Sequence, residues 1–190
     1  MVVLGGSVPP GLTADVYAEL VSLLRTRGVR TVVDTAGKAL TAVLPARPTL
    51  IKPNAEEAGG LVGRPLTNDE EIYRAAEELR SRGAEYVVIS LGAEGAIAVG
   101  PTGGRKAVPP CVVALSAVGS GDSMVAGMAV ALAEGGTIDD MLRLGTAAGA
   151  ATAKVPGTQL GDPREVARLI GQVRVCVLEP VETPADNAAG

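Results

Sequence analysis

The sequence predicts an α/β fold, with a mainly parallel sheet and helices on both of its faces. Three observations support this. Short apolar runs alternate with stretches of helical periodicity along most of the chain. The run from Tyr86 to Leu91 is almost continuously apolar, as in a strand buried on both faces. Polar or glycine-rich residues follow the strand-like runs, and open sheets of this kind bind ligands at the carboxyl ends of their strands.

The first expected elements are a strand at Val2–Leu4, a rigid loop at Gly5–Gly11, and a helix that Thr13 caps and Gly28 ends. The later elements follow from the same patterns of periodicity, capping and glycine or proline breaks. We expect strands at 31–33, 50–51, 86–91, 96–99 and 173–178, a short edge strand at 105–108, and helices at 67–83, 121–134, 138–153 and 163–171.

The composition is that of a globular protein, with 47% hydrophobic and 20% charged residues. The net charge of −4 and the scattered basic residues predict neither nucleic acid nor an anionic membrane as a partner. Because no apolar run reaches the ~18 residues of a membrane span and no leader is apparent, we expect a cytoplasmic protein. Without histidine, Ser-His-Asp catalysis and His-ligated zinc are excluded. Cys111 and Cys176 lie in apolar runs and are expected to be buried free thiols.

The run from Val118 to Gly127 is the most informative stretch. Gly119 and Gly121 flank Ser120, and Asp122 follows where an apolar helical pattern begins. Glycines allow close approach of a ligand, and the free N–H groups of a first helical turn bind anions, phosphate above all. A carboxylate beside that anion site could accept the proton of an alcohol that attacks a phosphoryl group. The alternative is that Asp122 only complements the helix dipole.

The run from Lys52 to Glu57 (KPNAEE) is a second candidate site. Asn54 and Glu57 lie one turn apart at an expected helix start, so both could hold the waters of Mg²⁺. Lys52 could place its charge over nucleotide phosphates. The alternative is an ordinary solvated helix start.

These two runs resemble signatures of the PfkB/ribokinase family of carbohydrate kinases. The run at 118–127 is similar to the family's G-A-G-D signature, with Ser120 where alanine is usual, and most closely to the 1-phosphofructokinase and tagatose-6-phosphate kinase branch. The run at 52–57 is similar to K-P-N-x-x-E. Weaker similarities lie at 5–11 (S-G-S-L-P-P-G, with Gly5 replacing the first serine), 34–40 (D-x-S-G-x-A-L), 90–96 (the nucleotide loop) and 156–158 (P-G-T).

The resemblance implies a three-layer α/β/α ribokinase-like fold that uses ATP and Mg²⁺. It implies that Asp122 is the catalytic base and that backbone amides of the preceding residues form the anion hole. Ser7 would reach the sugar phosphate. The implied anion-hole residues are Gly119, Ser120 and Gly121; the implied nucleotide-binding residues are Lys52, Ser90, Gly92, Ala93, Glu94, Gly95 and Gly149; and Asn54 and Glu57 are the implied metal residues. Close helix packing is the alternative reason for the small residues at 145–151, Gly149 among them.

The resemblance covers residues 1–178 and only the C-terminal, ATP-binding and catalytic part of the family. The family's N-terminal strands, β-strand lid and glycine-rich sugar motif have no counterpart in the sequence. We therefore expect an open sheet edge, which favours association, with a homodimer as one expected form. Residues 179–190, which are acidic and rich in proline and alanine, predict a disordered tail.

Two functions follow from these patterns. The first is an ATP-dependent kinase acting on a hydroxyl of a phosphorylated ketohexose, with fructose 1-phosphate first and fructose 6-phosphate and tagatose 6-phosphate behind it. The second is a truncated, catalytically inactive nucleotide-binding remnant of such a kinase. A Rossmann dehydrogenase and a P-loop kinase are excluded, because neither G-x-G-x-x-G after the first strand nor G-x-x-x-x-G-K-[ST] occurs.

Overall fold

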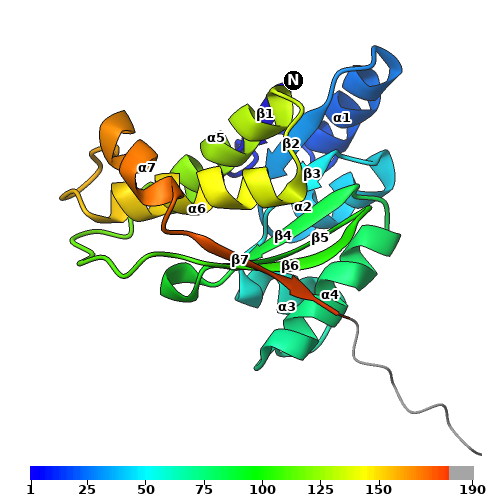
Figure 1. Ribbon diagram of the computed structural model, residues 1–190. Helices are drawn as coiled ribbons and strands as arrows, with labels where there is room; N and C mark the ends of the chain where they lie inside the picture. The colour runs from blue at the N-terminus through cyan, green and yellow to red at the C-terminus, as the bar shows by residue number, and fades with distance from the viewer. Residues whose placement is uncertain (180–190) are drawn as a thin grey trace, which may run out of the picture.

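A computed structural model describes residues 1–179, so that residues 180–190, nearly all of the predicted tail, lie outside the described residues. The described part is built on one seven-stranded sheet whose strands lie side by side in chain order (Figure 1). The strands are β1 (Val2–Gly5), β2 (Thr31–Asp34), β3 (Leu50–Ile51), β4 (Tyr86–Ser90), β5 (Ala96–Gly100), β6 (Gly103–Val108) and β7 (Arg174–Leu178).

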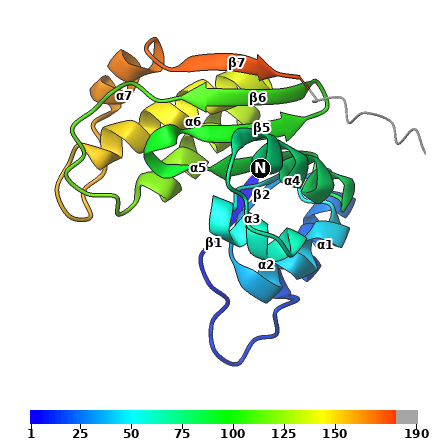
Figure 2. The same ribbon diagram turned by 90° about the horizontal axis from the view of Figure 1, so that it is seen from below.

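The sheet is mixed. Strands β1 to β4 are parallel to one another, whereas β5, β6 and β7 are each antiparallel to the preceding strand. The parallel arrangement predicted from the sequence is therefore found in β1 to β4. The connections from β4 to β5 and from β5 to β6 are too short for the crossover that a parallel pair needs. Figure 2 shows β7 alongside β6, so β6 is an inner strand and not the edge strand predicted at 105–108.

Helices cover both faces of the sheet, as predicted. One core cluster joins the sheet to α1 (Val16–Thr26), α2 (Gly37–Val43), α3 (Ala55–Val62) and α4 (Asp69–Ser81), and a second joins it to α5 (Ser120–Ala133), α6 (Ile138–Ala153) and α7 (Pro163–Ile170). Two short 3₁₀ helices are Leu44–Ala46 and Gly92–Glu94. The neighbours Val32 and Val33 belong to different clusters, because successive strand residues point to opposite faces. The α/β/α architecture is confirmed.

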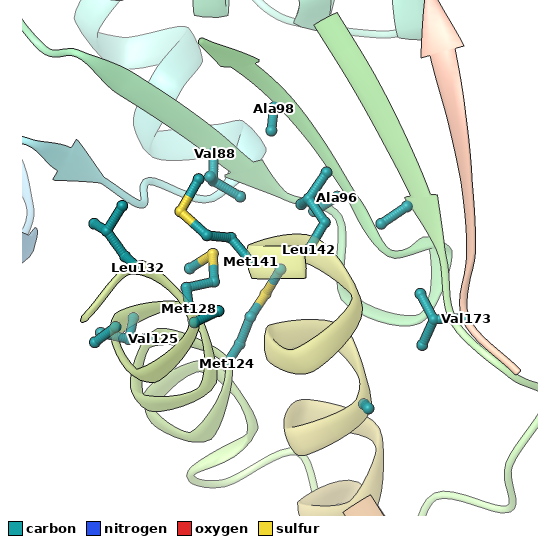
Figure 3. Close-up of a cluster of buried hydrophobic side chains, with 14 of the residues drawn as sticks. Val88, Ala96, Ala98, Met124, Val125, Met128, Leu132, Met141, Leu142 and Val173 are labelled. Carbon is teal, nitrogen blue, oxygen red and sulfur yellow. The ribbon is translucent and has the colours of Figure 1, made fainter. Parts of the chain in front are cut away.

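Helix α5, which begins at the Gly-Ser-Gly-Asp run, packs closely on α6. Figure 3 shows Met124 and Met128 of α5 beside Met141 of α6, in the cluster that also contains Val88 of β4. A Cβ atom on Gly127 would lie 2.8 Å from the backbone oxygen of Leu144. Glycine at this position therefore lets the backbones of α5 and α6 approach closely.

Some local predictions are wrong. Helix α1 has Asp15 at its N-cap position with no side-chain cap hydrogen bond, so Thr13 does not cap it. Cys111 and Cys176 are both exposed. Cys111 lies in the irregular segment before α5, and Cys176 lies on β7, whose outer edge is unpaired within residues 1–179. Apolar neighbours in sequence therefore did not imply burial at either position.

Candidate active site

Four side chains gather at the carboxyl ends of the parallel strands, and the sequence predicts three of them, Ser7, Glu57 and Asp122, as site residues. Ser7 follows β1, Asp34 ends β2, Glu57 lies in the first turn of α3, and Asp122 lies in the first turn of α5. All four line one cleft of about 590 Å³. The cleft lies where an open α/β sheet is expected to bind its ligand.

The first turn of α5 has free backbone donors. Its N-cap residue, Gly119, has a φ of +77°, a left-handed conformation that favours glycine, and supplies no side-chain cap. The N–H of Ser123 donates to the Gly119 oxygen at 2.9 Å. Within residues 1–179 the N–H groups of Gly121 and Asp122 donate to no protein acceptor. These two groups, next to the exposed Asp122 carboxylate, are what an anion hole requires.

A partly buried ion pair lies beside this turn. The side chain of Lys52 is 8% exposed, and its Nζ lies 3.3 Å from Oδ1 of Asp34. The same Nζ lies 3.8 Å from the position that a Cβ atom on Gly121 would occupy. The Lys52 ammonium is thus close to the free N–H groups of α5 and adds positive charge to a site already suited to an anion.

Asp34 is an acid whose surroundings disfavour its charged form. Burial raises the pKa of Asp34, against the opposing effect of the Lys52 ammonium, and the nearby carboxylates of Asp122 and Glu57 raise it further. From the sequence alone, a helix cap was the simplest role for this residue. The strand-end position and the similarity at 34–40 were the signals that could have placed Asp34 in the site.

Asn54 and Glu57 hold the start of α3 through reciprocal hydrogen bonds. The Glu57 N–H donates to Oδ1 of Asn54 at 2.8 Å, and the Asn54 N–H donates to Oε2 of Glu57 at 2.9 Å. In the described part of the chain, no three His, Cys, Asp or Glu side chains are grouped closely enough to hold a metal ion. The remaining carboxylate oxygen of Glu57 is compatible with a hydrated Mg²⁺, which keeps several of its waters.

The expected nucleotide loop follows β4 and does not line the cleft. The Ser90 N–H donates to the Pro53 oxygen at 3.0 Å, so the end of β4 is tied to the segment that carries Lys52. Gly92, Ala93 and Glu94 form a 3₁₀ turn. Gly95 has a φ of +97°, and a Cβ atom there would lie 2.0 Å from the Ala107 oxygen, so the fold itself requires this glycine.

Gly149 and Ser120 meet where α6 crosses α5. A Cβ atom on Gly149 would lie 3.0 Å from the Ser120 backbone oxygen, so close packing accounts for this glycine. The Ser120 hydroxyl is buried and has no hydrogen-bond partner within the described residues. The role of Gly149 in nucleotide binding stays a prediction.

The mixed α/β/α sheet carries free N–H groups, an ammonium and carboxylates at the carboxyl ends of its parallel strands. The family model described as pfkB family carbohydrate kinase matches residues 1–165. The chain therefore belongs to the pfkB family of carbohydrate kinases.

Curated relatives agree with this assignment. The chain is 41% identical over 162 residues to ATP-dependent 6-phosphofructokinase isozyme 2 of Escherichia coli K12, covering 84% of this chain and 52% of that protein. It is 41% identical over 180 residues to 1-phosphofructokinase of Rhodobacter capsulatus, covering 95% of this chain and 57% of the relative. The chain thus spans about half the length of the curated relatives it matches.

Solved structures share the fold. Phosphofructokinase-2 of Escherichia coli in complex with potassium superposes with a TM-score of 0.85 at 38% identity, covering 90% of this chain and 56% of that one. The ribokinase of Arabidopsis thaliana, at 22% identity and a TM-score of 0.76 over 88% of this chain and 55% of that one, supports the fold alone. None of the helices described is long and apolar enough to cross a membrane.

Proposed function

We propose that the chain is the ATP-binding and catalytic part of a kinase that transfers the γ-phosphoryl group of ATP to a hydroxyl of a phosphorylated ketohexose. Fructose 1-phosphate, giving fructose 1,6-bisphosphate, is the first candidate. The observation that carries the proposal is the position of Asp122, which lines the cleft from the same helical turn as two free N–H groups. Relatives named as 1-phosphofructokinases and a 6-phosphofructokinase support the class of acceptor.

In this proposal Asp122 accepts the proton of the attacking hydroxyl. A carboxylate that is open to the cleft can act as a base once it is within hydrogen-bond distance of that hydroxyl. The N–H groups of Gly121 and Asp122, with the Lys52 ammonium, would stabilise the charge on the transferred phosphoryl group. Phosphoryl transfer depends mainly on such positioning and charge stabilisation.

The binding roles belong to the same proposal. Ser7, exposed on the loop after β1, would donate its hydroxyl to the sugar phosphate. The turn from Gly92 to Gly95 would lie against ATP, with α6 around Gly149 at its base. Glu57, and Asn54 through its free amide group, would hold the waters of Mg²⁺. When bound, Mg²⁺ neutralises charge on the phosphates of ATP.

A coupled assay of ADP release from Mg-ATP tests the proposal. The assay compares fructose 1-phosphate, fructose 6-phosphate and tagatose 6-phosphate, using the parent chain and an Asp122→Asn variant. We expect release that depends on the sugar phosphate, is fastest with fructose 1-phosphate, and disappears in the variant. Equal rates of ADP release by the parent chain and the Asp122→Asn variant would show that Asp122 is not the base.

The second candidate function is nucleotide binding without turnover. Exposure of both Ser7 and Asp122 favours it, because phosphoryl transfer requires a site from which water is excluded. Calorimetry with Mg-ATP separates the two candidates. Saturable ATP binding, together with no release of ADP from ATP in the presence of any of the three sugar phosphates, would establish the second function.

The proposal includes self-association. β1 is hydrogen-bonded only to β2 among the described strands, and Val3 on β1 is 47% exposed, so an open edge and an apolar side chain occur together. Light scattering on the purified chain would show a dimer mass if the homodimer forms. A cytoplasmic location, and the absence of nucleic-acid and membrane partners, stay predictions.

A further inference from the structure

A second hollow lies at the amino ends of the parallel strands, whereas the candidate active site lies at their carboxyl ends. It has a volume of about 330 Å³, and Arg30, Thr49 and Glu85, which immediately precede β2, β3 and β4, line it. Arg25, in the last turn of α1, and Arg47, after the 3₁₀ turn at Leu44–Ala46, complete the basic part of the lining. Three exposed arginines, one at the end of α1, one just before β2 and one just before β3, therefore line one hollow.

The charge of this hollow is opposite in sign to that of the chain. The sequence has a net charge of −4, whereas the lining has three arginines and one acid, Glu85. Within residues 1–179 none of the three arginine side chains forms an ion pair or a hydrogen bond, whereas arginines such as Arg64, Arg82 and Arg105 are paired with carboxylates. Arg25 lies in the last turn of α1, where a positive charge is favourable because it complements the helix dipole. This reason does not apply to Arg30 and Arg47, because they lie outside α-helices.

The base of the hollow is fixed by the sheet. Pro48 and Thr49 are buried, and the Thr49 hydroxyl accepts a hydrogen bond from the Thr31 N–H at 3.1 Å. The Glu85 N–H donates to the Pro48 oxygen at 3.1 Å. The backbone segments next to Arg30 and Arg47 are thus tied to one another before any ligand binds, which lowers the entropy cost of binding.

Arg47 occupies a backbone conformation that suits its side chain poorly. Its φ is +62°, and it is the one residue other than glycine with a positive φ among those the structure describes. Glycine or asparagine adopts this conformation at lower cost. A Cβ atom on Gly83 would lie 2.2 Å from the Leu44 oxygen and 3.6 Å from Cγ of Arg47, so Gly83 packs tightly against this turn. Strained residues of this kind concentrate at functional sites.

From the three arginines of the lining, the fixed base and the positive φ of Arg47, we propose that this hollow binds a small multivalent phosphate anion of the size of pyrophosphate. The planar guanidinium fork matches phosphate oxygens in pairs, and an anion would relieve the mutual repulsion of three like charges. A volume of about 330 Å³ has room for roughly ten water-sized groups at ~30 Å³ each. The site is separate from the proposed kinase site and does not depend on the kinase activity.

Calorimetry with inorganic pyrophosphate, at fixed ionic strength and without Mg²⁺, tests the proposal. The variants are Arg30→Gln and Arg47→Gly, the latter because glycine suits a φ of +62°. The matched control is Arg174→Gln, which removes an exposed arginine from β7, outside the lining. We expect saturable binding by the parent and the control, about tenfold weaker binding at this hollow in each single variant, and loss of this binding step in the double variant, with any weaker binding at the candidate active site unchanged.

Three results would overturn the proposal: no saturable binding by the parent, unchanged binding in both lining variants, or equal loss in Arg174→Gln. Unchanged binding in the lining variants would assign the anion to the candidate active site or elsewhere. Equal loss of pyrophosphate affinity in Arg174→Gln would show that the effect of the lining variants comes from the net charge of the chain and not from the hollow. Circular dichroism of each variant checks that the fold is retained.

Discussion

Helices α3 and α5 begin at the same edge of the sheet, and each has a carboxylate in its first turn, but the two carboxylates are used differently. In α3 the Glu57 carboxylate accepts the Asn54 N–H, and the Asn54 side chain accepts the Glu57 N–H. In α5 the N-cap is a glycine, and the Asp122 side chain has no hydrogen bond within the described residues. A helix start closed by its own side chains contributes to stability, whereas an open one is available to a ligand.

The two helix starts have one neighbour in common. Lys52 precedes α3 along the chain, and its Nζ lies close to Gly121 in the first turn of α5. Its ion pair with Asp34 anchors this charge at the end of β2. The open start therefore gains positive charge from the segment that leads into the closed one.

The largest expected effect is on turnover, from Asp122→Asn. If Asp122 is the base, sugar-dependent ADP release falls about 10²- to 10⁴-fold, because proton acceptance in the transition state contributes that much. The free energy of unfolding changes by less than about 1 kcal/mol, since an exposed charge at a helix start contributes only a dipole interaction.

Glu56→Gln is the matched control for Asp122→Asn. Glu56 is an exposed carboxylate in the first turn of α3 that lines neither the candidate active site nor the second hollow, so turnover and stability should both be retained. A large loss of stability in Asp122→Asn, measured by urea unfolding, would contradict the view that the start of α5 is kept open for a ligand.

The next effect is on stability, from Lys52→Met. This change leaves the Asp34 carboxylate partly buried without its cation, and we expect a loss of about 1–3 kcal/mol in the free energy of unfolding. In the double variant with Asp34→Asn, much of this loss should be recovered, because no uncompensated charge is left. Urea unfolding of the two single variants and the double variant measures the coupling. Strictly additive losses would mean that the ion pair does not join the two sides of the site.

A third comparison separates capping from metal binding. Asn54→Ala and Thr137→Ala each remove one side of a capping box, at the starts of α3 and α6, and each should cost about 0.5–2 kcal/mol of stability. If Asn54 also holds waters of Mg²⁺, only Asn54→Ala raises the Mg²⁺ concentration needed for half-maximal turnover. Equal Mg²⁺ requirements in the two variants would limit Asn54 to capping.

The elements that are specified locally were predictable from the sequence. The bounds predicted for helix α6, 138–153, are those observed. The gathering of Ser7, Asp34 and Asp122 at one edge also followed from local features, since each comes after a strand or at a helix start. Parallel strands then bring such residues together without further information.

The parts that depend on distant partners were not predictable. β6 resembles an edge strand by composition, and it becomes an inner strand only because β7, about 65 residues later, pairs with it. Asn54 and Glu57 are spaced equally well for a capping box and for a shared metal ion. Their spacing in the sequence therefore does not show that side-chain oxygens of both residues accept hydrogen bonds within the capping box. The proximity of Lys52 to Gly121 likewise arises from packing between segments far apart in sequence.

The smallest expected effect is a pH dependence of stability that comes from Asp34. Burial raises the pKa of Asp34 in the folded protein above its ordinary value of 3.8, so the folded state binds the proton more tightly than the unfolded state. The stability from this group is then fully present below the unfolded pKa and is lost as pH rises through the folded pKa. Between acidic and neutral pH, the parent should therefore lose stability relative to Asp34→Asn. Urea unfolding of both proteins as a function of pH isolates this difference from the other carboxylates, and the opposite sign would show that the Lys52 charge outweighs burial.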